Sequence, residues 1–362
     1  MSRYMGIPHG RLYAWTIVLT IGSALLGGCH LQNQKAKPTI EITRVPPASP
    51  GGPDQLDLIE GRVTNAESSQ QIVIYAHSGP WWVQPKAELP FTKIQPDFTW
   101  KNSTHLGIEY AVLLVEPGYS PQSKMVALPP KGNGVAAVAV VKGKGGQPVT
   151  SKVIHFSGYD WVVRAASSDR GGPSNAYDPE NAWVDPKGYL HLRMAVVNGR
   201  WACAEVNLTR SLGYGSYRFV VQDSAHLSPS AVVGMFTMDE MRNSMIGNEL
   251  DIELSRWGKA ESKNSQYVVQ PFYVPENIDR FNTPAGVVTH TYRWDPGKAS
   301  FASFPGTVVR PGSKASSGHV FTAGVPTAAA QTVHINLYDF HHSKSSPEHP
   351  VEVVIEKFEY LP

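Results

Sequence analysis

Three acidic residues alternate with aliphatic residues in one short segment of the chain, which reads ELDIE. Successive side chains of a β-strand point to opposite faces. Glu249, Asp251 and Glu253 are therefore expected to share one face, while Leu250 and Ile252 enter a core. Like charges held side by side raise one another's pKa, so that one carboxyl group can stay protonated near neutral pH while another is ionised. This spacing indicates acid–base chemistry by paired carboxyl groups.

Hydrolysis of a glycosidic bond with retention needs two carboxyl groups about 5 to 5.5 Å apart, a nucleophile and a general acid that then acts as a base. On an extended strand the Cα atoms of Glu249 and Glu253 would lie roughly 13 Å apart, and two long side chains that lean together close most of this gap. Asp251 could hydrogen-bond Glu249 and keep it ionised, which leaves Glu253 as the group to be protonated. From the residues alone, a solvated acidic strand face and a calcium site stay open as alternatives.

The N-terminus has the features of a secretion signal. Arginines precede an apolar run, Tyr13 to Leu26, that is short for a transmembrane helix. The run ends in LLGGC, which resembles the lipobox of bacterial lipoproteins, where cleavage before the cysteine leaves Cys29 to be lipidated. We therefore expect a signal peptide at residues 1–28, a lipid anchor at Cys29, and a location in the bacterial cell envelope, either membrane-anchored or secreted.

The composition excludes several classes of function. The 32 basic and 30 acidic residues give a net charge of +2, which is not the footprint of a nucleic-acid-binding protein. Only Cys203 remains once Cys29 is lipidated, so no intramolecular disulfide is expected. The chain has no paired zinc-ligand motif, phosphate-binding loop or nucleophile elbow. We expect no metal at the reacting groups and no required cofactor, with a structural Ca²⁺ ion left open.

Short strand-like runs separated by Pro, Gly and Asn predict an all-β chain with two sandwiches. The expected parts are a tether at 29–38, an accessory immunoglobulin-like β-sandwich at 39–130, a linker at 131–150 and a larger sandwich at 151–362. Trp81 and Trp82 of the accessory domain are candidates for stacking on sugar rings. Adjacent strand residues face opposite ways, however, and tryptophan in a small β-domain is more often part of the core.

The larger domain resembles glycoside hydrolase family 16. ELDIE resembles the family's E-[aliphatic]-D-[aliphatic]-E signature, and other segments resemble the family in the same order. WVDPKGYLHLRM, WACAEVNLTRSLGYGSYRFVVQ and SAVVGMFTMD precede the signature, and HTYRWDP and VHINLYDF follow it. The resemblance covers about Ile154 to Tyr360. It implies a concanavalin-like β-jelly roll and retaining, endo-acting hydrolysis of internal β-glycosidic bonds in a β-glucan or related β-galactan.

On the matching positions, the resemblance implies that Glu249 is the nucleophile, Glu253 the general acid and base, and Asp251 the residue that positions the nucleophile. It also implies sugar contacts from four further residues, Trp257, His290, Asn336 and Tyr338. The family usually has tryptophan where Tyr338 stands, and FASFPG at residues 301–306 replaces a segment that commonly ends in D-G. These departures leave the substrate open.

Two other functions fit the same residues. A transglycosylase of the same fold would pass the sugar held by Glu249 to another glycan instead of to water, and a non-catalytic lipoprotein would only bind carbohydrate. In each case we expect a polysaccharide and, through the lipid anchor, a membrane as partners, no nucleic acid, and a monomeric protein.

Overall fold

A computed structural model describes residues 36–49, 51, 55–145, 152–166, 175–197, 200–242, 244, 246–307, 309–310, 312–340 and 349–362. The predicted signal peptide and lipidated Cys29 lie outside these residues. In this part of the chain the regular structure is 25 β-strands and two single 3-10 turns, η1 (Pro179–Asn181) and η2 (Pro275–Asn277). The all-β prediction is confirmed. None of the helical segments described is long and apolar enough to cross a membrane.

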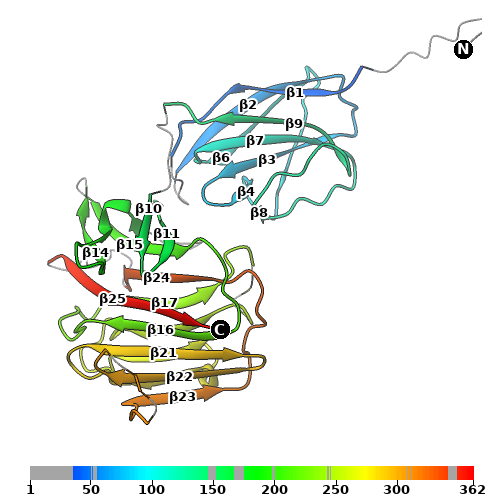
Figure 1. The fold of residues 1–362 in the computed structure, drawn as a ribbon. Helices are drawn as coiled ribbons and strands as arrows, with labels where there is room; N and C mark the ends of the chain where they lie inside the picture. The colour runs from blue at the N-terminus through cyan, green and yellow to red at the C-terminus, as the bar shows by residue number, and fades with distance from the viewer. Residues whose placement is uncertain are drawn as a thin grey trace, which may run out of the picture. The chain divides into compact units, whose positions relative to one another are not determined.

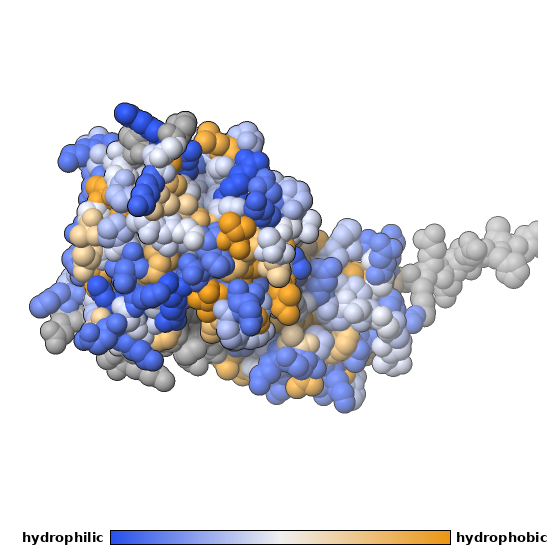
Figure 2. Space-filling view, turned by 90° about the horizontal axis from the view of Figure 1, so that it is seen from below, coloured by the Kyte–Doolittle hydropathy of each residue, from blue (hydrophilic) through white to orange (hydrophobic). Residues whose placement is uncertain are grey.

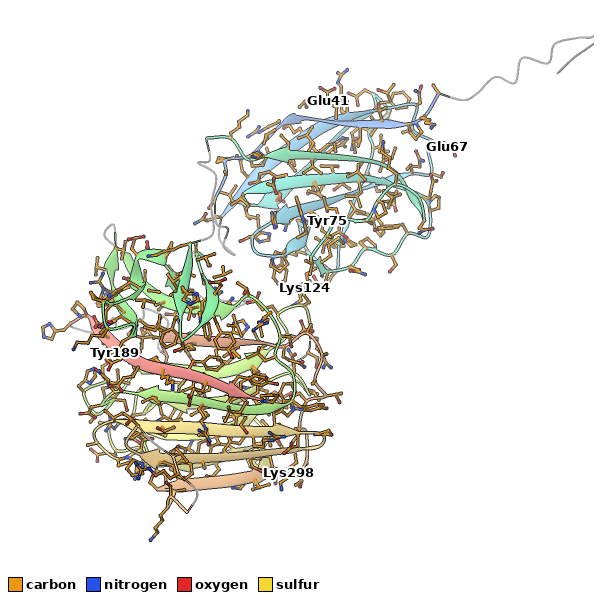
Figure 3. The ribbon with its side chains drawn as sticks, viewed as in Figure 1. Glu41, Glu67, Tyr75, Lys124, Tyr189 and Lys298 are labelled. Atoms are coloured by element: carbon orange, nitrogen blue, oxygen red, sulfur yellow. The ribbon has the colours of Figure 1, made fainter. Side chains whose placement is uncertain are left out.

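The first nine strands form two sheets of their own, in the orders β1-β2-β6 and β8-β4-β3-β7-β9, with β5 paired to β3 (Figure 1). They are β1 (Thr39–Arg44), β2 (Leu56–Thr64), β3 (Gln71–His77), β4 (Trp81–Gln84), β5 (Phe91–Thr92), β6 (Thr99–His105), β7 (Glu109–Val115), β8 (Lys124–Met125) and β9 (Val135–Lys142). Alternate residues of facing strands, including Ile59, Ile74 and Val112, build the core between these sheets. Glu41 on β1 and Tyr75 on β3 come from the two different sheets (Figure 3).

The segment at 131–150 is not a simple linker. Its residues Val135–Lys142 form β9, which pairs with β7 from Val115 to Glu109. Val135 and Ala137 are buried in the two hydrophobic clusters on either face of this sheet, and the register shifts between them. The prediction was wrong for this stretch, which belongs to the smaller sandwich.

Trp81 and Trp82 take opposite sides of β4, as strand alternation requires. The ring of Trp81 is buried and stacks on His77 with a centroid distance of 4.6 Å. Trp82 is only partly buried, and its Nε1 donates a hydrogen bond of 3.2 Å to the carbonyl of Ser78. The two rings therefore do not share one stacking surface.

The remaining strands form one hydrogen-bonded path that folds into two facing layers. One layer has the order β20-β19-β18-β17-β24-β15, with β11 at its edge, and the other has the order β14-β25-β16-β21-β22-β23. The strands of the first layer are β11 (Tyr159–Val163), β15 (Arg200–Leu208), β17 (Ala231–Met238), β18 (Leu250–Leu254), β19 (Ser265–Val269), β20 (Ile278–Phe281) and β24 (Thr332–Asp339). Those of the second are β14 (Leu190–Val197), β16 (Gly215–Val221), β21 (Val288–Asp295), β22 (Lys298–Pro305), β23 (Ser317–Phe321) and β25 (Val351–Leu361). The short strands β10 (Val153–Phe156), β12 (Ala176–Tyr177) and β13 (Ala182–Val184) flank β11, β15 and β14. This is the predicted β-jelly-roll sandwich.

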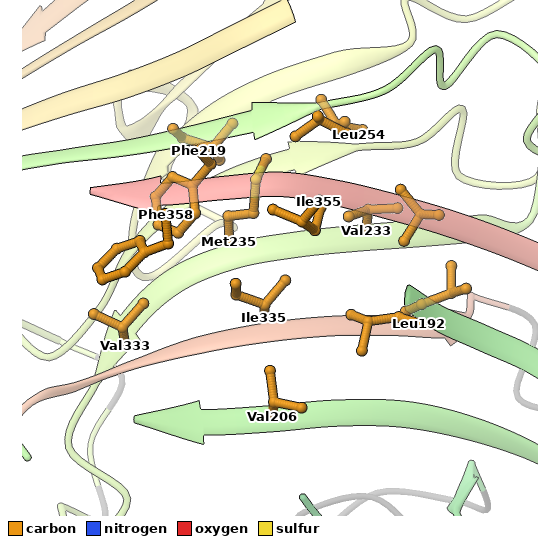
Figure 4. Close-up of a cluster of buried hydrophobic side chains, with 14 of the residues drawn as sticks. Leu192, Val206, Phe219, Val233, Met235, Leu254, Val333, Ile335, Ile355 and Phe358 are labelled. Atoms are coloured by element: carbon orange, nitrogen blue, oxygen red, sulfur yellow. The ribbon is translucent and has the colours of Figure 1, made fainter. Parts of the chain in front are cut away.

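The core of the larger sandwich lies between its two layers (Figure 4). Side chains from the first layer meet side chains from the second: Val206, Val233, Met235, Leu254, Val333 and Ile335 on one side, Leu192, Phe219, Ile355 and Phe358 on the other. Their close packing fixes the register of every strand in the first layer. On the outer surface drawn in Figure 2, hydrophobic residues form scattered patches among hydrophilic ones.

Substitution of Ile252 measures how much the core contributes to holding β18 in place. Its side chain is 0% exposed and lies in the cluster between the layers. We expect Ile252→Ala to lower the free energy of unfolding by about 2 to 5 kcal/mol, because a buried aliphatic side chain is replaced by a cavity. Urea denaturation would measure the change. The control is Val320→Ala, which removes an exposed side chain on β23 and should change stability by less than about 0.5 kcal/mol. Equal stability of both variants would contradict this account.

Candidate active site

The three acids lie on the outer face of the first layer, at its middle strands. Strand β18 pairs with β17 and β19, and its inward residues Leu250, Ile252 and Leu254 are buried in the core. Asp251 and Glu253 point the other way, and Glu249 directly precedes the strand, where its carbonyl accepts a hydrogen bond from Gln270 N at 3.2 Å. The structure therefore brings together the three carboxyl groups that the sequence singled out.

Asp251 is the most enclosed of the three acids, with 3% of its surface exposed. Burial raises its pKa well above the ordinary value, and the charges of Glu249 and Glu253 and a hydrogen bond to Glu249 raise it further. The amide of Gln270 opposes this by donating a hydrogen bond of 3.0 Å to Asp251 Oδ2. Two carboxyl groups can hydrogen-bond only if one holds a proton. The raised pKa makes Asp251 the protonated partner of Glu249.

Glu253 has the properties of a proton donor near neutral pH. Burial raises its pKa from 4.5 to about 7, the charge of Glu249 adds to the increase, and a hydrogen bond from Gln266 and the charge of Arg280 oppose it. The side-chain amide of Gln266 donates to Glu253 Oε2. Arg280 Nε in turn donates to Gln266 Oε1 at 3.1 Å. This chain of contacts holds the carboxyl group in one orientation and sets how readily it loses its proton.

Trp257 is connected to the same chain of contacts. It follows β18 with a backbone φ of 47°, and its amide donates to Ser255 Oγ at 2.9 Å. The guanidinium of Arg280 lies 4.4 Å from the centre of its ring, which is a cation–π contact. Arg280 thus contacts both Trp257 and the amide that binds Glu253. The predicted sugar-binding residue lies close to the carboxyl groups.

Asn336 and Tyr338 lie on β24, on the same outer face as the acids. Asn336 pairs with Gly234 of β17, and Gly234 pairs with Glu253 on its other side. The side-chain oxygen of Asn336 accepts a hydrogen bond of 3.0 Å from Gly234 N. A Cβ atom on Gly234 would lie only 2.6 Å from that oxygen. A side chain at position 234 would therefore displace the Asn336 side chain, which lies over the strand that separates it from Glu253.

The prediction for His290 was wrong. This residue lies on β21 of the second layer, and its side chain is 0% exposed because it shares the inward face with Tyr292 and Trp294. Its Nδ1 is 2.8 Å from Ser303 Oγ. Burial lowers its pKa to about 3, so the ring is neutral. A side chain enclosed between the layers does not contact a ligand on the outer face.

Sequence reasoning missed four residues that support the acids: Gly234, Gln266, Gln270 and Arg280. A signal for two of them is present in SQYVVQ, where polar Gln266 and Gln270 are four residues apart and so share a strand face. No comparable signal marks Gly234 or Arg280. They reach the acids only through strand pairing and a side-chain contact.

One group of described residues could hold a metal ion. Ligand atoms of Glu205, Glu240 and His334 lie within 4.8 Å of one another, and Glu205 and His334 are fully buried. Both oxygens of Glu205 already have partners, since Arg164 Nη1 lies 2.7 Å from Oε2 and His334 Nδ1 lies 3.1 Å from Oε1. Because the arginine balances the buried carboxylate, we describe the group as a hydrogen-bonded ion network and assign no metal to it.

The raised pKa of Glu253 predicts how stability depends on pH. The folded protein holds a proton between pH 4.5 and about 7 that the unfolded chain releases, so this group's contribution to stability falls as pH rises through that range. Glu253→Gln should remove this loss. Urea midpoints should favour the variant over the wild type more at pH 8 than at pH 5. Glu41→Gln, at an exposed position, is the control. If the difference in urea midpoint between Glu253→Gln and the wild type were the same at both pH values, the raised pKa of Glu253 would be contradicted.

No family model and no curated protein matches the chain. Several solved structures are similar to it at low identity. A β-glucanase of Bacillus licheniformis has a TM-score of 0.43 and 17% identity, over 60% of this chain and all of that one. A β-1,3-glucanase from Mycobacterium marinum has a TM-score of 0.44 and 15% identity, over 60% of this chain and 94% of that one. A pseudo β-1,3-glucanase of Mycobacterium tuberculosis has a TM-score of 0.42 and 14% identity, over 55% and 88%.

Proposed function

We propose that the protein is a retaining, endo-acting hydrolase of internal β-glycosidic bonds in a polysaccharide of the β-glucan or β-galactan type. One observation supports this above all. Three carboxyl groups share the outer face of one strand, and the central one, Asp251, is hydrogen-bonded to Glu249 while Glu253 is held separately by Gln266. A structural strand gains nothing from such repulsion, whereas two-step glycoside hydrolysis needs one ionised and one protonated carboxyl group.

In the first step, the ionised Glu249 attacks the anomeric carbon of the sugar, and the bond to the leaving oxygen breaks as Glu253 gives that oxygen its proton. The product is a glycosyl ester of Glu249 and a shortened glycan. In the second step, Glu253, now a carboxylate, takes a proton from water as the water oxygen attacks the same carbon. The ester bond breaks and Glu249 is released as a carboxylate. Asp251 orients Glu249 through their hydrogen bond.

The surrounding residues fit this assignment of roles. A general acid works best when its pKa lies near the working pH, and the pKa of Glu253 is about 7. Trp257, Asn336 and Tyr338 are the proposed sugar contacts. The absence of a side chain at Gly234 leaves Asn336 next to the strand of the carboxyl groups. The lipid anchor at Cys29, the place in the cell envelope and the monomeric state remain predictions from the sequence.

Substitution of each catalytic acid tests the assignment directly. We expect Glu249→Gln and Glu253→Gln each to lower kcat by about 10³-fold or more on a polysaccharide, because an amide is neither a nucleophile nor a proton donor. Reducing-sugar release would be measured on mixed-linkage glucan, laminarin, xyloglucan, agarose and carrageenan. Glu41→Gln, on β1, is the control.

An aryl glycoside with a good leaving group separates the two roles. The phenolate leaves without needing a proton. Glu253→Gln should therefore still release one equivalent of phenol in a burst, whereas Glu249→Gln should release none. Full activity of either variant on the polymer would refute the assignment. Products longer than the substrate would instead favour a transglycosylase, and binding without turnover would favour the non-catalytic carbohydrate-binding protein.

The pH dependence of kcat/KM gives a further test. Activity should fall above about pH 7, where Glu253 loses its proton, and should fall at low pH, where the nucleophile becomes protonated. The charge of Arg280 lowers the pKa of Glu253, so Arg280→Gln should move the alkaline limb to higher pH. The control is Arg293→Gln, on β21 of the other layer. An alkaline limb that stays in place in Arg280→Gln would contradict the role of this contact.

A further inference from the structure

Two large aromatic side chains are exposed beside the carboxyl groups. Phe272 and Tyr273 follow β19, and 54% and 66% of their surfaces are exposed. Their rings meet edge to face with a centroid distance of 5.9 Å. Adjacent exposed aromatic residues place apolar surface in water, which is a cost unless a ligand covers them.

The position of this aromatic pair is fixed relative to the catalytic strand. One side-chain amide, that of Gln270, connects them: its Nε2 donates to Asp251 Oδ2 at 3.0 Å and its Oε1 accepts from Phe272 N at 2.8 Å. The following turn is closed by Asn277 Nδ2, which donates to the carbonyl of Pro271 at 3.2 Å. The segment that carries the two rings is therefore tied to the same carboxyl group that orients Glu249.

We propose that Phe272 and Tyr273 form a platform on which a pyranose ring of a neutral β-linked glycan stacks, next to the bond that is cut. This inference rests on the proposed function. The axial hydrogens of a β-linked pyranose form a flat apolar face that matches an exposed aromatic ring. The platform lies at the Glu249 end of β18, because β19 runs antiparallel to β18 and its last residue, Val269, pairs with Leu250. Trp257 follows the opposite end of β18, so it contacts a different part of the glycan.

The local charge favours a neutral glycan over a sulfated or uronic one. The ionised Glu249 is hydrogen-bonded to Asp251, which contacts Gln270 directly before the platform, and Glu276 follows the platform in the turn. Of the described cations, Arg280 is engaged with Gln266 and the Trp257 ring, and Arg242 Nη1 donates to the carbonyl of Gly247 at 2.8 Å. Negative groups on a polymer would therefore meet repulsion from these carboxylates near the platform.

The experiment uses the full chain with Phe272→Ala, Tyr273→Ala and the double variant. The probes are neutral mixed-linkage glucan, laminarin, xyloglucan and agarose, and sulfated carrageenan. On the neutral polymer that the wild type cuts fastest, each alanine should raise KM about tenfold with kcat within about twofold, because stacking contributes to binding and not to the reacting groups. Phe272→Trp and Tyr273→Phe keep a ring and should stay near the wild-type KM. Val320→Ala, of similar exposure on β23, is the matched control.

Binding measured in a Glu249→Gln background separates this inference from the proposed function. If the wild type cuts a neutral glycan and the alanine variants keep its KM and Kd, the platform is refuted and the hydrolase stands. If no polymer is cut but a neutral glycan binds and the alanine variants lose about tenfold in affinity, the platform stands and the hydrolase is refuted. Preference for carrageenan over agarose would overturn the neutral-glycan inference, and binding of no polymer would overturn the platform.

Discussion

Burial of the inward side chains of β18 in the core is the constraint on which the acidic outer face of the larger sandwich depends. This strand must be held in register, because a shift of β18 by one residue would turn Glu249, Asp251 and Glu253 from the outer face into the core. The inward side chains of β18 prevent this, since Leu250 and Ile252 are fully buried between the two layers. The hydrophobic core thus holds the acids in position on the outer face, where the proposed chemistry takes place.

Repulsion among the three carboxyl groups is reduced locally, in a different way at each acid. Asp251 holds a proton and shares it with Glu249, whereas Glu253 is contacted by the amide of Gln266 and by the field of Arg280. Amide donors can bind a carboxylate without adding a full charge, so the site keeps one group ready to lose a proton. The resulting asymmetry between otherwise similar acids is what a two-step displacement requires.

Predictions from strand periodicity and predictions from position within a family pattern had different outcomes. Alternation along ELDIE placed three acids correctly because the period of a strand is a local property. The role expected for His290 came from the resemblance and was wrong, because burial between the layers excludes it from the outer face. The segment Val135–Lys142 forms β9 and not a linker, because it pairs with β7 in the folded sandwich, and its continuous apolar run does not by itself name that partner.

The sequence by itself determined the all-β class, the face shared by Glu249, Asp251 and Glu253, and the inward side of β18, because each follows from local alternation of polar and apolar residues. Only the tertiary structure decided which amides and cations meet the acids. Gln266 and Arg280 are brought to Glu253 by the pairing of β18, β19 and β20, and Asn336 is brought there across Gly234. Contacts between strands depend on register and on packing against the opposite layer, and these are set by the whole sandwich rather than by any one segment.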